Sequence, residues 1–409
     1  MNCRHCKTLL DLTLVDLGSA PPSNAYLTPQ TLKGPEKWFP LRVVVCQSCW
    51  LAQTEDFTDA DDLFNAEYAY FSGFSTSWLA HSERYVNEMA ARFELNSQSH
   101  VVEIAANDGY LLQYVKALGI PCTGVEPTAS TAAAARLKGL DIVEEFFGVA
   151  LANTLVDTGN SADLAIANNV LAHVPNINDF VGGFATLLKP QGVSTFEFPH
   201  LQCLVAENQF DTIYHEHFSY LSLTTVCHIF ASQGLAVFDV EKLSTHGGSL
   251  RVFAQRSDTG QHALSPHVAA VLAEEERAGM RSAAYYDGFQ AKVENVKNDF
   301  LSFLLTAKNE GKSVAAYGAA AKGNTLMNYA GIRPDLVSFV VDRNPAKQDK
   351  FMPGSRIPIL NEAHLVEAKP DYVVILPWNL RQEVVQQLAY IKNWGGSFVT
   401  AVPSLQNFT

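Results

Sequence analysis

The sequence contains no run of about 18 or more apolar residues, the length that an α-helix needs to cross a bilayer. Its first residues also lack the apolar core of a secretory signal peptide. Basic residues are few, since 29 Lys and Arg face 42 Asp and Glu, and the net charge is -13. A field of that sign repels phosphate backbones. We therefore expect neither a membrane segment nor a nucleic-acid partner.

Cysteines are scarce, and four of the seven occur as two Cys-x-x-Cys pairs, Cys3/Cys6 and Cys46/Cys49. Each pair can turn two thiolates toward one ion, and two pairs together form the tetrahedral sulfur site typical of structural zinc. So short a segment buries too little apolar area to fold alone, so we expect a small module that depends on the metal. A pair of buried or redox-active Cys-x-x-Cys motifs is the alternative.

The other three cysteines, Cys122, Cys203 and Cys227, are isolated in apolar stretches. They are typical of reduced core residues, and we therefore expect a cytoplasmic protein. With 409 residues, of which 47% are hydrophobic, the chain is long enough for about two or three globular domains.

Strands and helices alternate along two parts of the chain. The first series has expected strands at 100–106, 122–125, 142–146, 164–167 and 193–198. A long, charged, helical stretch at 268–310 precedes the second series, with expected strands at 313–317, 337–341, 372–375 and 397–400. Such alternation is typical of doubly wound α/β sheets. The predicted fold class is α/β, with two Rossmann-like doubly wound domains preceded by a small zinc-binding module, divided as 1–62, 63–252 and 253–409.

The first predicted strand opens into the loop Ala105-Ala106-Asn107-Asp108-Gly109, and the next strand ends in Glu126. A carboxylate there can accept hydrogen bonds from both ribose hydroxyls of an adenosine ligand, either NAD or S-adenosylmethionine. Ala105 and Asn107 replace the first two glycines of the dinucleotide motif. A ligand without phosphate tolerates this exchange better, which favours a methyltransferase over a dehydrogenase. A turn that binds no ligand is the further alternative.

Four segments together resemble the sugar-nucleotide C-methyltransferases, which build branched-chain deoxysugars. They are 102–112, which contains the loop above, then 168–174, 214–220 and 317–324. The most specific is Tyr214-His215-Glu216-His217, in a chain that also carries four-cysteine knuckles. The resemblance covers essentially the whole chain in order, and members of the family share the alanine-rich loop.

The resemblance implies S-adenosylmethionine as the cofactor, with Asn168 at its methionine end and Phe147 near its adenine. Phe147 could equally belong to the core. The expected cofactor-binding residues are Glu103, Ala105, Asn107, Gly109, Glu126, Phe147 and Asn168.

Methylation of a carbon beside a ketone requires a base, donors that stabilise an enolate oxygen, and a carbanion that faces the sulfonium methyl. Histidine suits the base because its pKa lies near neutral pH. A neighbouring glutamate, here Glu216, can fix the tautomer of such a base. The resemblance implies that His217 is the base, with Tyr214 and Glu216 in the same pocket as a proton relay or as sugar contacts. It also implies that His173 stabilises the enolate and that Tyr70 reaches the site.

Simpler roles are open for some of these residues. His215 and His217 could bind a metal ion, although alternate side chains of an extended segment face opposite sides and His215 would then point elsewhere. His173 could cap the following helix, and Tyr70 could be a core aromatic residue.

The second α/β series contains a small-residue turn at 317–324 that could hold a phosphate at a helix start, and Asp342 ends the next strand. The resemblance implies a degenerate Rossmann fold that presents a nucleotide sugar and carries no second cofactor. The expected substrate contacts are Tyr317, Lys322, Asn324, His246 and Arg251, the last two near the diphosphate.

The sequence therefore predicts methyl transfer from S-adenosylmethionine to C3 of a nucleotide-diphosphate 4-keto-6-deoxy sugar through an enediolate, with dTDP as the expected nucleotide. The alternatives are an NAD-dependent nucleotide-sugar oxidoreductase or epimerase, and a zinc-dependent interaction module without enzymatic activity. The nucleotide base, the sugar substituents and the oligomeric state stay open, and a monomer is compatible with the sequence.

Overall fold

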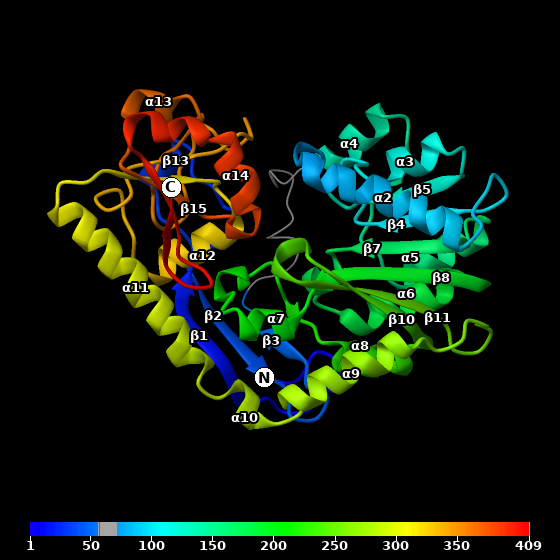
Figure 1. The fold of residues 1–409 in the computed structure, drawn as a ribbon. Coiled ribbons are helices and arrows are strands. Elements are labelled where there is room, and N and C mark those ends of the chain that lie inside the picture. Colours follow the sequence, from blue (N-terminus) through cyan, green and yellow to red (C-terminus); the bar gives the residue numbers. More distant parts are fainter. Residues whose placement is uncertain (56, 58–71, 409) are drawn as a thin grey trace.

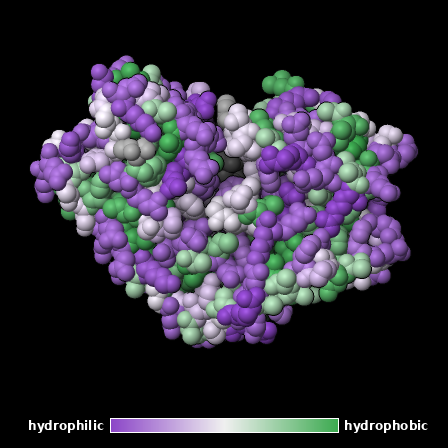
Figure 2. Space-filling view, in the orientation of Figure 1, coloured by the Kyte–Doolittle hydropathy of each residue, from purple (hydrophilic) through white to green (hydrophobic). Residues whose placement is uncertain are grey.

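The computed structural model describes residues 1–55, 57 and 72–408. Two lobes diverge from a common base that contains the N-terminus (Figure 1). Figure 2 shows a hollow between the two lobes on the face displayed. Within the described residues, no helix combines the length and the apolar character required to cross a membrane.

A small antiparallel sheet forms the base. Its strand order is β1-β2-β3-β9, with β1 Leu12–Ala20, β2 Phe39–Val45, β3 Ala52–Thr54 and β9 Ser219–Tyr220. Strand β9 comes from much later in the chain and pairs with β3 through Ala52↔Tyr220 and Gln53↔Ser219. The zinc-type module is therefore joined by main-chain hydrogen bonds to the segment that follows His217.

A seven-stranded sheet forms one lobe, in the order β10-β11-β8-β7-β4-β5-β6. Strands β8, β7, β4, β5 and β6 are parallel, whereas β11 is antiparallel to both β8 and β10. The strand order reverses between β4 and β7, and ligands of such sheets bind beyond the carboxyl ends of the strands at that point. The strands are β4 Val101–Ile104, β5 Cys122–Val125, β6 Asp141–Val143, β7 Ala162–Asn168, β8 Leu188–Pro199, β10 Leu235–Leu243 and β11 Ser249–Arg256.

The longer helices of this lobe follow from their sequence patterns and caps. Helix α2 begins after Ser75, whose side chain accepts a hydrogen bond from Trp78 N, and α6 begins after Asn176 in the same way. The helices are α2 Thr76–Arg92, α3 Leu112–Ala117, α4 Ala129–Leu137, α5 Val149–Asp157, α6 Ile177–Leu187, α7 Leu201–Ala206 and α8 Leu223–Ser232.

The second lobe contains a six-stranded sheet in the order β14-β13-β12-β15-β16-β17, parallel except for β17. Its strands are β12 Val314–Tyr317, β13 Val340–Val341, β14 Ile359–Leu360, β15 Tyr372–Ile375, β16 Ser397–Thr400 and β17 Gln406–Phe408, and its helices are α12 Ala321–Tyr329, α13 His364–Ala368 and α14 Arg381–Gln387.

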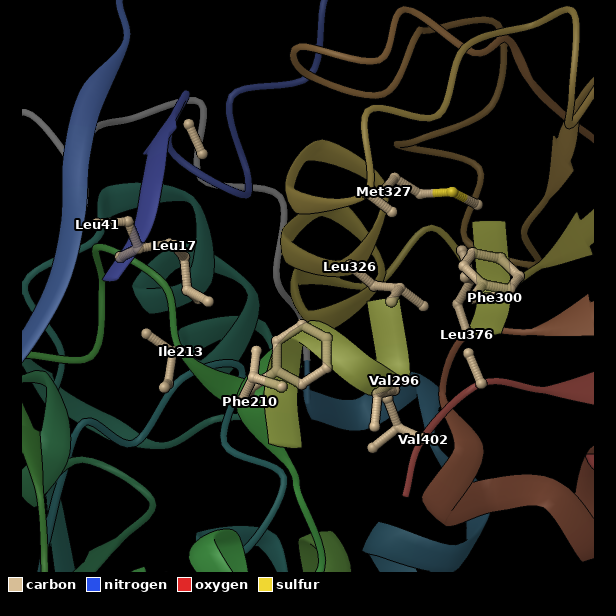
Figure 3. Packing of buried hydrophobic residues seen from close by; sticks show 14 of the residues in the cluster. Leu17, Leu41, Phe210, Ile213, Val296, Phe300, Leu326, Met327, Leu376 and Val402 are labelled. Atoms are coloured by element: carbon tan, nitrogen blue, oxygen red, sulfur yellow. The ribbon is translucent and has the colours of Figure 1, made fainter. Parts of the chain in front are cut away.

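Three helices connect the lobes along the base (Figure 1): α9 Pro266–Ala278, α10 Ala283–Tyr286 and α11 Phe289–Asn309. The N-terminal sheet and the second lobe share one hydrophobic core, in which Leu17 and Leu41 belong to the same cluster as Phe300 and Leu326 (Figure 3). The cysteine end of the module instead packs into the core of the first lobe. The module therefore contributes apolar residues to the cores of both lobes.

The predicted fold class is confirmed, and several expected strands, including 122–125, 372–375 and 397–400, have the observed bounds. The helical stretch expected at 268–310 is divided into α9, α10 and α11, because Gly279 and Gly288 adopt left-handed backbone conformations. The antiparallel strands β10 and β11 are not among the expected strands. The domain boundaries stay a prediction, and β11 runs through the boundary proposed at residue 252.

Candidate active site

A cavity of about 370 Å³ lies at the switch point of the seven-stranded sheet. Its walls come from the loops that follow the parallel strands β4, β5, β6 and β7, and from Trp78 of α2 and His246. Such a volume suits a small-molecule ligand of nucleoside size.

The loop after β4 has a strained backbone. Ala105 and Asn107 line the cavity at φ values of 58° and 50°, and Gly109 follows with φ of 74°. A Cβ atom on Gly109 would lie 2.2 Å from Leu140 Cδ1, so only glycine fits. Left-handed backbone costs a residue with a Cβ atom about 1–2 kcal/mol, and surrounding structure must therefore hold Ala105 in place.

Glu126, at the end of β5, supports that loop and faces the cavity. Its Oε2 accepts a hydrogen bond from Asn107 N at 2.9 Å, and its Oε1 accepts one from Thr128 N at 2.9 Å. A carboxylate oxygen accepts two hydrogen bonds, so both oxygens keep capacity for the two hydroxyls of a ribose.

Glu103, predicted to bind the cofactor, does not belong to the cavity wall. Its carboxyl is buried beside Tyr110, and this burial raises its pKa well above the usual value. We therefore no longer regard Glu103 as a ligand contact.

Two amide oxygens at the end of β7 are suited to a cationic group. Asn168 and Asn169 line the cavity, and each Oδ1 is buried without a hydrogen-bond partner in the described part of the chain. A buried acceptor without a partner is costly, and the ammonium of the methionine end of S-adenosylmethionine would satisfy it. Phe147 also lines the cavity, with its ring edge-on to Phe184 at 5.1 Å. These residues fit the cofactor.

The predicted catalytic side chains meet beside the cavity. The His217 ring lies 4.6 Å from the His173 ring and 3.9 Å from the Tyr214 ring, measured between centroids. His217 Nδ1 lies 2.9 Å from the carbonyl oxygen of Thr212, which can only accept. Nδ1 must therefore carry the proton, and the lone pair of the neutral ring is on Nε2, as a general base requires.

The site keeps its histidines neutral. Burial, followed by the proximity of His173, holds the pKa of His217 well below its usual value. Burial also lowers the pKa of His173 to about 4 and that of His246 to about 4, and the Lys322 ammonium contributes to the lowering at His246 and His217. Neutral imidazoles are thus present throughout the physiological pH range.

Glu216 does not fix the tautomer of His217, contrary to our expectation, because the Thr212 carbonyl does so. Its Oε1 accepts hydrogen bonds from the amide groups of Asn24, and burial raises its pKa. His215 points elsewhere, as expected, with Nε2 at 3.2 Å from the carbonyl of Pro40. Tyr70 lies outside the described residues.

The predicted substrate residues occupy different places. Lys322 Nζ donates to Asn379 Oδ1 at 2.7 Å and lies over the Trp378 ring. Asn324 donates to the carbonyl of Ser23 at 2.6 Å, and its Oδ1 is buried without a partner in the described ranges. Tyr317 is hydrogen-bonded through its hydroxyl to the Gln387 amide at 2.9 Å.

Arg251 is held inside the first lobe. Its Nε donates to Glu197 at 2.7 Å and its NH1 to Glu241 at 2.9 Å, and it is 3% exposed. The Arg251 guanidinium is thus already ion-paired with carboxylates of its own sheet, and we no longer assign Arg251 as a substrate contact. His246, by contrast, lines the cavity with its ring edge-on to Trp78 at 5.3 Å.

Sequence reasoning missed several residues of the site. Trp78, Phe146 and Asp179 line the cavity. Buried Asp211 accepts a hydrogen bond from Trp378 Nε1 at 2.7 Å, and burial raises the pKa of Asp211 to about 6. An aromatic residue at the start of a helix and a lone aspartate carry no distinctive spacing, so no sequence signal identifies them.

The four predicted metal ligands converge. The sulfur atoms of Cys3, Cys6, Cys46 and Cys49 all lie within 4.8 Å of one another, and Cys3–Cys49 and Cys6–Cys46 are each separated by 3.5 Å. Tetrahedral Zn–S bonds of about 2.3 Å place sulfurs about 3.8 Å apart, so the cluster fits one zinc ion.

Family models match three consecutive parts of the chain: a zinc binding domain over residues 3–64, a methyltransferase domain over 78–240 and a C-methyltransferase C-terminal domain over 244–403. C-methyltransferase NovU of Streptomyces niveus is 34% identical over 401 residues, which cover 98% of this chain and 95% of NovU. A ubiquinone biosynthesis O-methyltransferase of Bradyrhizobium is 27% identical over 35% of this chain and 65% of its own length.

Among solved structures, magnesium protoporphyrin IX methyltransferase of Synechocystis PCC 6803 with bound SAM aligns with 50% of this chain and 100% of its own. The sequence identity is 14% and the TM-score is 0.36.

Replacement of Glu126 by Gln should weaken binding of S-adenosylhomocysteine at least tenfold. A hydrogen bond to a charged group contributes about 1.5–3 kcal/mol, and the amide can accept through one oxygen only. Isothermal titration calorimetry measures the change. The matched control is Glu144→Gln, because Glu144 pairs with Arg136 on the surface. Equal affinities of Glu126→Gln and the native protein would contradict this assignment.

Chelation should release about one zinc ion per chain and destabilise the N-terminal module, which lowers the melting temperature of the protein. Affinity for S-adenosylhomocysteine should change little, because the cavity wall contains none of the four cysteines. Elemental analysis, calorimetry and titration provide the three measurements. Cys46→Ser should reproduce the loss of zinc, whereas Cys122→Ser, outside the cluster, should retain a full complement. Full zinc content in Cys46→Ser would refute the ligand set.

The matched models and NovU describe methyltransferases, so we set the NAD-dependent and non-enzymatic alternatives aside. The chain belongs to the C-methyltransferase family that includes NovU, and it is an S-adenosylmethionine-dependent methyltransferase with an N-terminal zinc-binding domain.

Proposed function

We propose that the protein methylates C3 of a nucleotide-diphosphate 4-keto-6-deoxy sugar, with dTDP as the preferred nucleotide. The proposal is supported mainly by the surroundings of His217. Its Nδ1 carries the proton because it faces the Thr212 carbonyl, and its ring contacts that of His173 at the edge of the cavity. The sugar class follows from the motif resemblance described above, in particular that of Tyr214-His215-Glu216-His217.

His217 removes the C3 proton in this proposal. The C–H electron pair becomes part of an enediolate that extends over C3, C4 and the keto oxygen, and Nε2 holds the proton. S-adenosylmethionine supplies a methyl group on a sulfonium, an electrophile strong enough to need no metal. A neutral base in a site that excludes water accepts the proton without first losing a hydration shell.

Neighbouring side chains stabilise the developing oxyanion. Tyr214 and His173 each lie against the His217 ring and offer O–H or N–H donors, which a growing negative charge strengthens. The raised pKa of buried Glu216 keeps its carboxyl available as a donor or acceptor toward the sugar. Tyr70 stays a predicted member of this group.

The second lobe would hold the nucleotide diphosphate. Lys322 supplies a cation at the start of α12, and burial lowers the pKa of its amine. Its positive charge also contributes to the lowered pKa values of His217 and His246, which supports a place for Lys322 in the same site. We propose that Lys322, Asn324, Tyr317 and His246 bind the substrate between the lobes.

Incubation with methyl-labelled cofactor and a panel of dTDP- and GDP-4-keto sugars should transfer one label to the sugar carbon, detected by mass spectrometry. His217→Ala should lower turnover by about 10²–10⁴-fold, the usual contribution of a general base. His228→Ala, on the exposed side of α8, is the matched control. If His217→Ala keeps full turnover, the role of base passes to His173 or Glu216. If no sugar is labelled by the native protein, the proposed substrate class is wrong.

The pH profile of kcat/KM should lack an inflection near 6.5, the usual pKa of histidine. Because the pKa of His217 in the folded protein is lowered, the ring stays a competent base as the pH falls below 6.5, and activity is lost only at more acidic pH. Steady-state rates between about pH 4 and 9 test this. An acid limb centred at or above 6.5 would contradict the neutral, desolvated base.

A further inference from the structure

Arg4 lies between two zinc ligands, Cys3 and Cys6, but its side chain leaves the zinc knuckle. The residue is 6% exposed. Its NH1 donates to the carbonyl of Pro175 at 3.2 Å, and its NH2 donates to the carbonyl of Thr54 at 2.9 Å. The guanidinium therefore holds two separate main-chain segments.

Both segments lead directly to the histidines of the site. Pro175 follows His173 by two residues. Thr54 is hydrogen-bonded to the segment that carries His217. Its Oγ1 donates to the His217 carbonyl at 3.1 Å, and its main-chain N donates to the Phe218 carbonyl at 3.2 Å. The Arg4 guanidinium also lies over the Phe218 ring, 5.4 Å from its centroid.

Hydrogen bonds to the predicted zinc site also fix the backbone of Arg4. Its main-chain N–H donates to Gln53 Oε1 at 2.9 Å, and Gln53 Nε2 donates to Cys3 Sγ at 3.4 Å. The next residue, His5, shares two hydrogen bonds with Asn178, near the start of α6. A zinc ion bound by the flanking cysteines would hold this backbone rigidly.

We propose that Arg4 is a positioning residue, which transmits the rigidity of the zinc knuckle to His173 and His217 and sets their ring separation of 4.6 Å. The proposal rests on the proposed function, in which these two histidines act together. Arginine suits the task because its planar fork donates to two carbonyls at once, whereas lysine presents a single point charge. The zinc module thereby contributes to proton abstraction in addition to folding.

The test is Arg4→Gln, with Arg42→Gln as the matched control, because Arg42 is in the same module but pairs with Glu55 at the surface. Zinc content should stay at the native value in both variants, and Arg42→Gln should also keep the native affinity for S-adenosylhomocysteine. Incubation with the 4-keto sugar and S-adenosylhomocysteine in D₂O should exchange the C3 proton for deuterium without methyl transfer. Arg4→Gln should slow this exchange about 10–100-fold, as loss of an outer-shell support typically does, and Arg42→Gln should not.

NMR of protein labelled at histidine nitrogen provides a readout that needs no substrate. Arg4→Gln should shift the ring signals of His173 and His217, while those of His228 stay in place. Thr54→Val removes the hydroxyl bond to the His217 carbonyl without changing Arg4, and should slow deuterium exchange as well. If Arg4→Gln fails to fold or loses zinc, the exchange rate of Thr54→Val tests the proposal instead.

The proposal would be overturned if zinc-loaded Arg4→Gln exchanged the C3 proton at the native rate and its histidine ring signals did not shift. If Arg4→Gln cannot be used, a native exchange rate in Thr54→Val would overturn it. His217→Ala separates this failure from that of the proposed function. If His217→Ala exchanges the C3 proton at the native rate, or if the native protein does not exchange it, the assignment of the base or of the substrate is wrong. If His217→Ala alone abolishes exchange, only the role of Arg4 is refuted.

Discussion

The architecture depends on the attachment of the segment from Asp211 to Tyr220, because three parts of the molecule hold it at once. Strand β3 of the zinc module pairs with its last residues. The first lobe accepts a hydrogen bond from Phe218 N through the carbonyl of Ala172 at 2.8 Å. The second lobe contributes Thr325, whose hydroxyl donates to the Ile213 carbonyl at 2.7 Å. His217, the proposed base on this segment, is therefore placed relative to both lobes by contacts to its main chain, which leave little freedom.

Burial gives that placement its chemical effect. Water is excluded around His217 and Glu216, and desolvation lowers the pKa of the imidazole and raises that of the carboxyl, so both are biased toward their neutral forms. Lys322 and Asp211 shift toward neutrality as well, for the same reason. A neutral imidazole can accept a proton in such a pocket without first being separated from a fixed countercharge.

The sequence was sufficient for features that depend on local pattern. Alternating strands and helices predicted the α/β class, and Ala105, Asn107, Glu126, Phe147 and Asn168 do line the cavity, because residues at the carboxyl ends of parallel strands share one edge of a sheet. The paired cysteine spacing likewise predicted a cluster that the fold assembles from two distant loops.

Features that depend on contacts between distant segments could not be predicted. The tautomer of His217 is set by the Thr212 carbonyl, and a main-chain group has no signature in the sequence. Arg251 was misplaced because Glu88, Glu197 and Glu241, which surround it, are spread over three elements. The short strand β9 has two residues and no alternation of its own, so only its pairing with β3 defines it.

In each α/β lobe, a carboxylate near the end of one strand accepts a hydrogen bond from the loop that follows the neighbouring strand, but the surroundings of the two loops differ. Asp342 Oδ2 accepts a hydrogen bond from Ala319 N at 2.7 Å, much as Glu126 accepts one from Asn107 N. In the second lobe, however, Tyr26 of the zinc module and Lys347 both donate to the carbonyl of Ala319, at 2.6 Å and 2.8 Å. The side chains of Tyr26 and Lys347 therefore lie directly beside the loop of the second lobe. The N-terminal module therefore contacts both folds but in different ways, because Tyr26 donates to the Ala319 carbonyl in one lobe and Arg4 donates to the carbonyl of Pro175, at the cavity of the other.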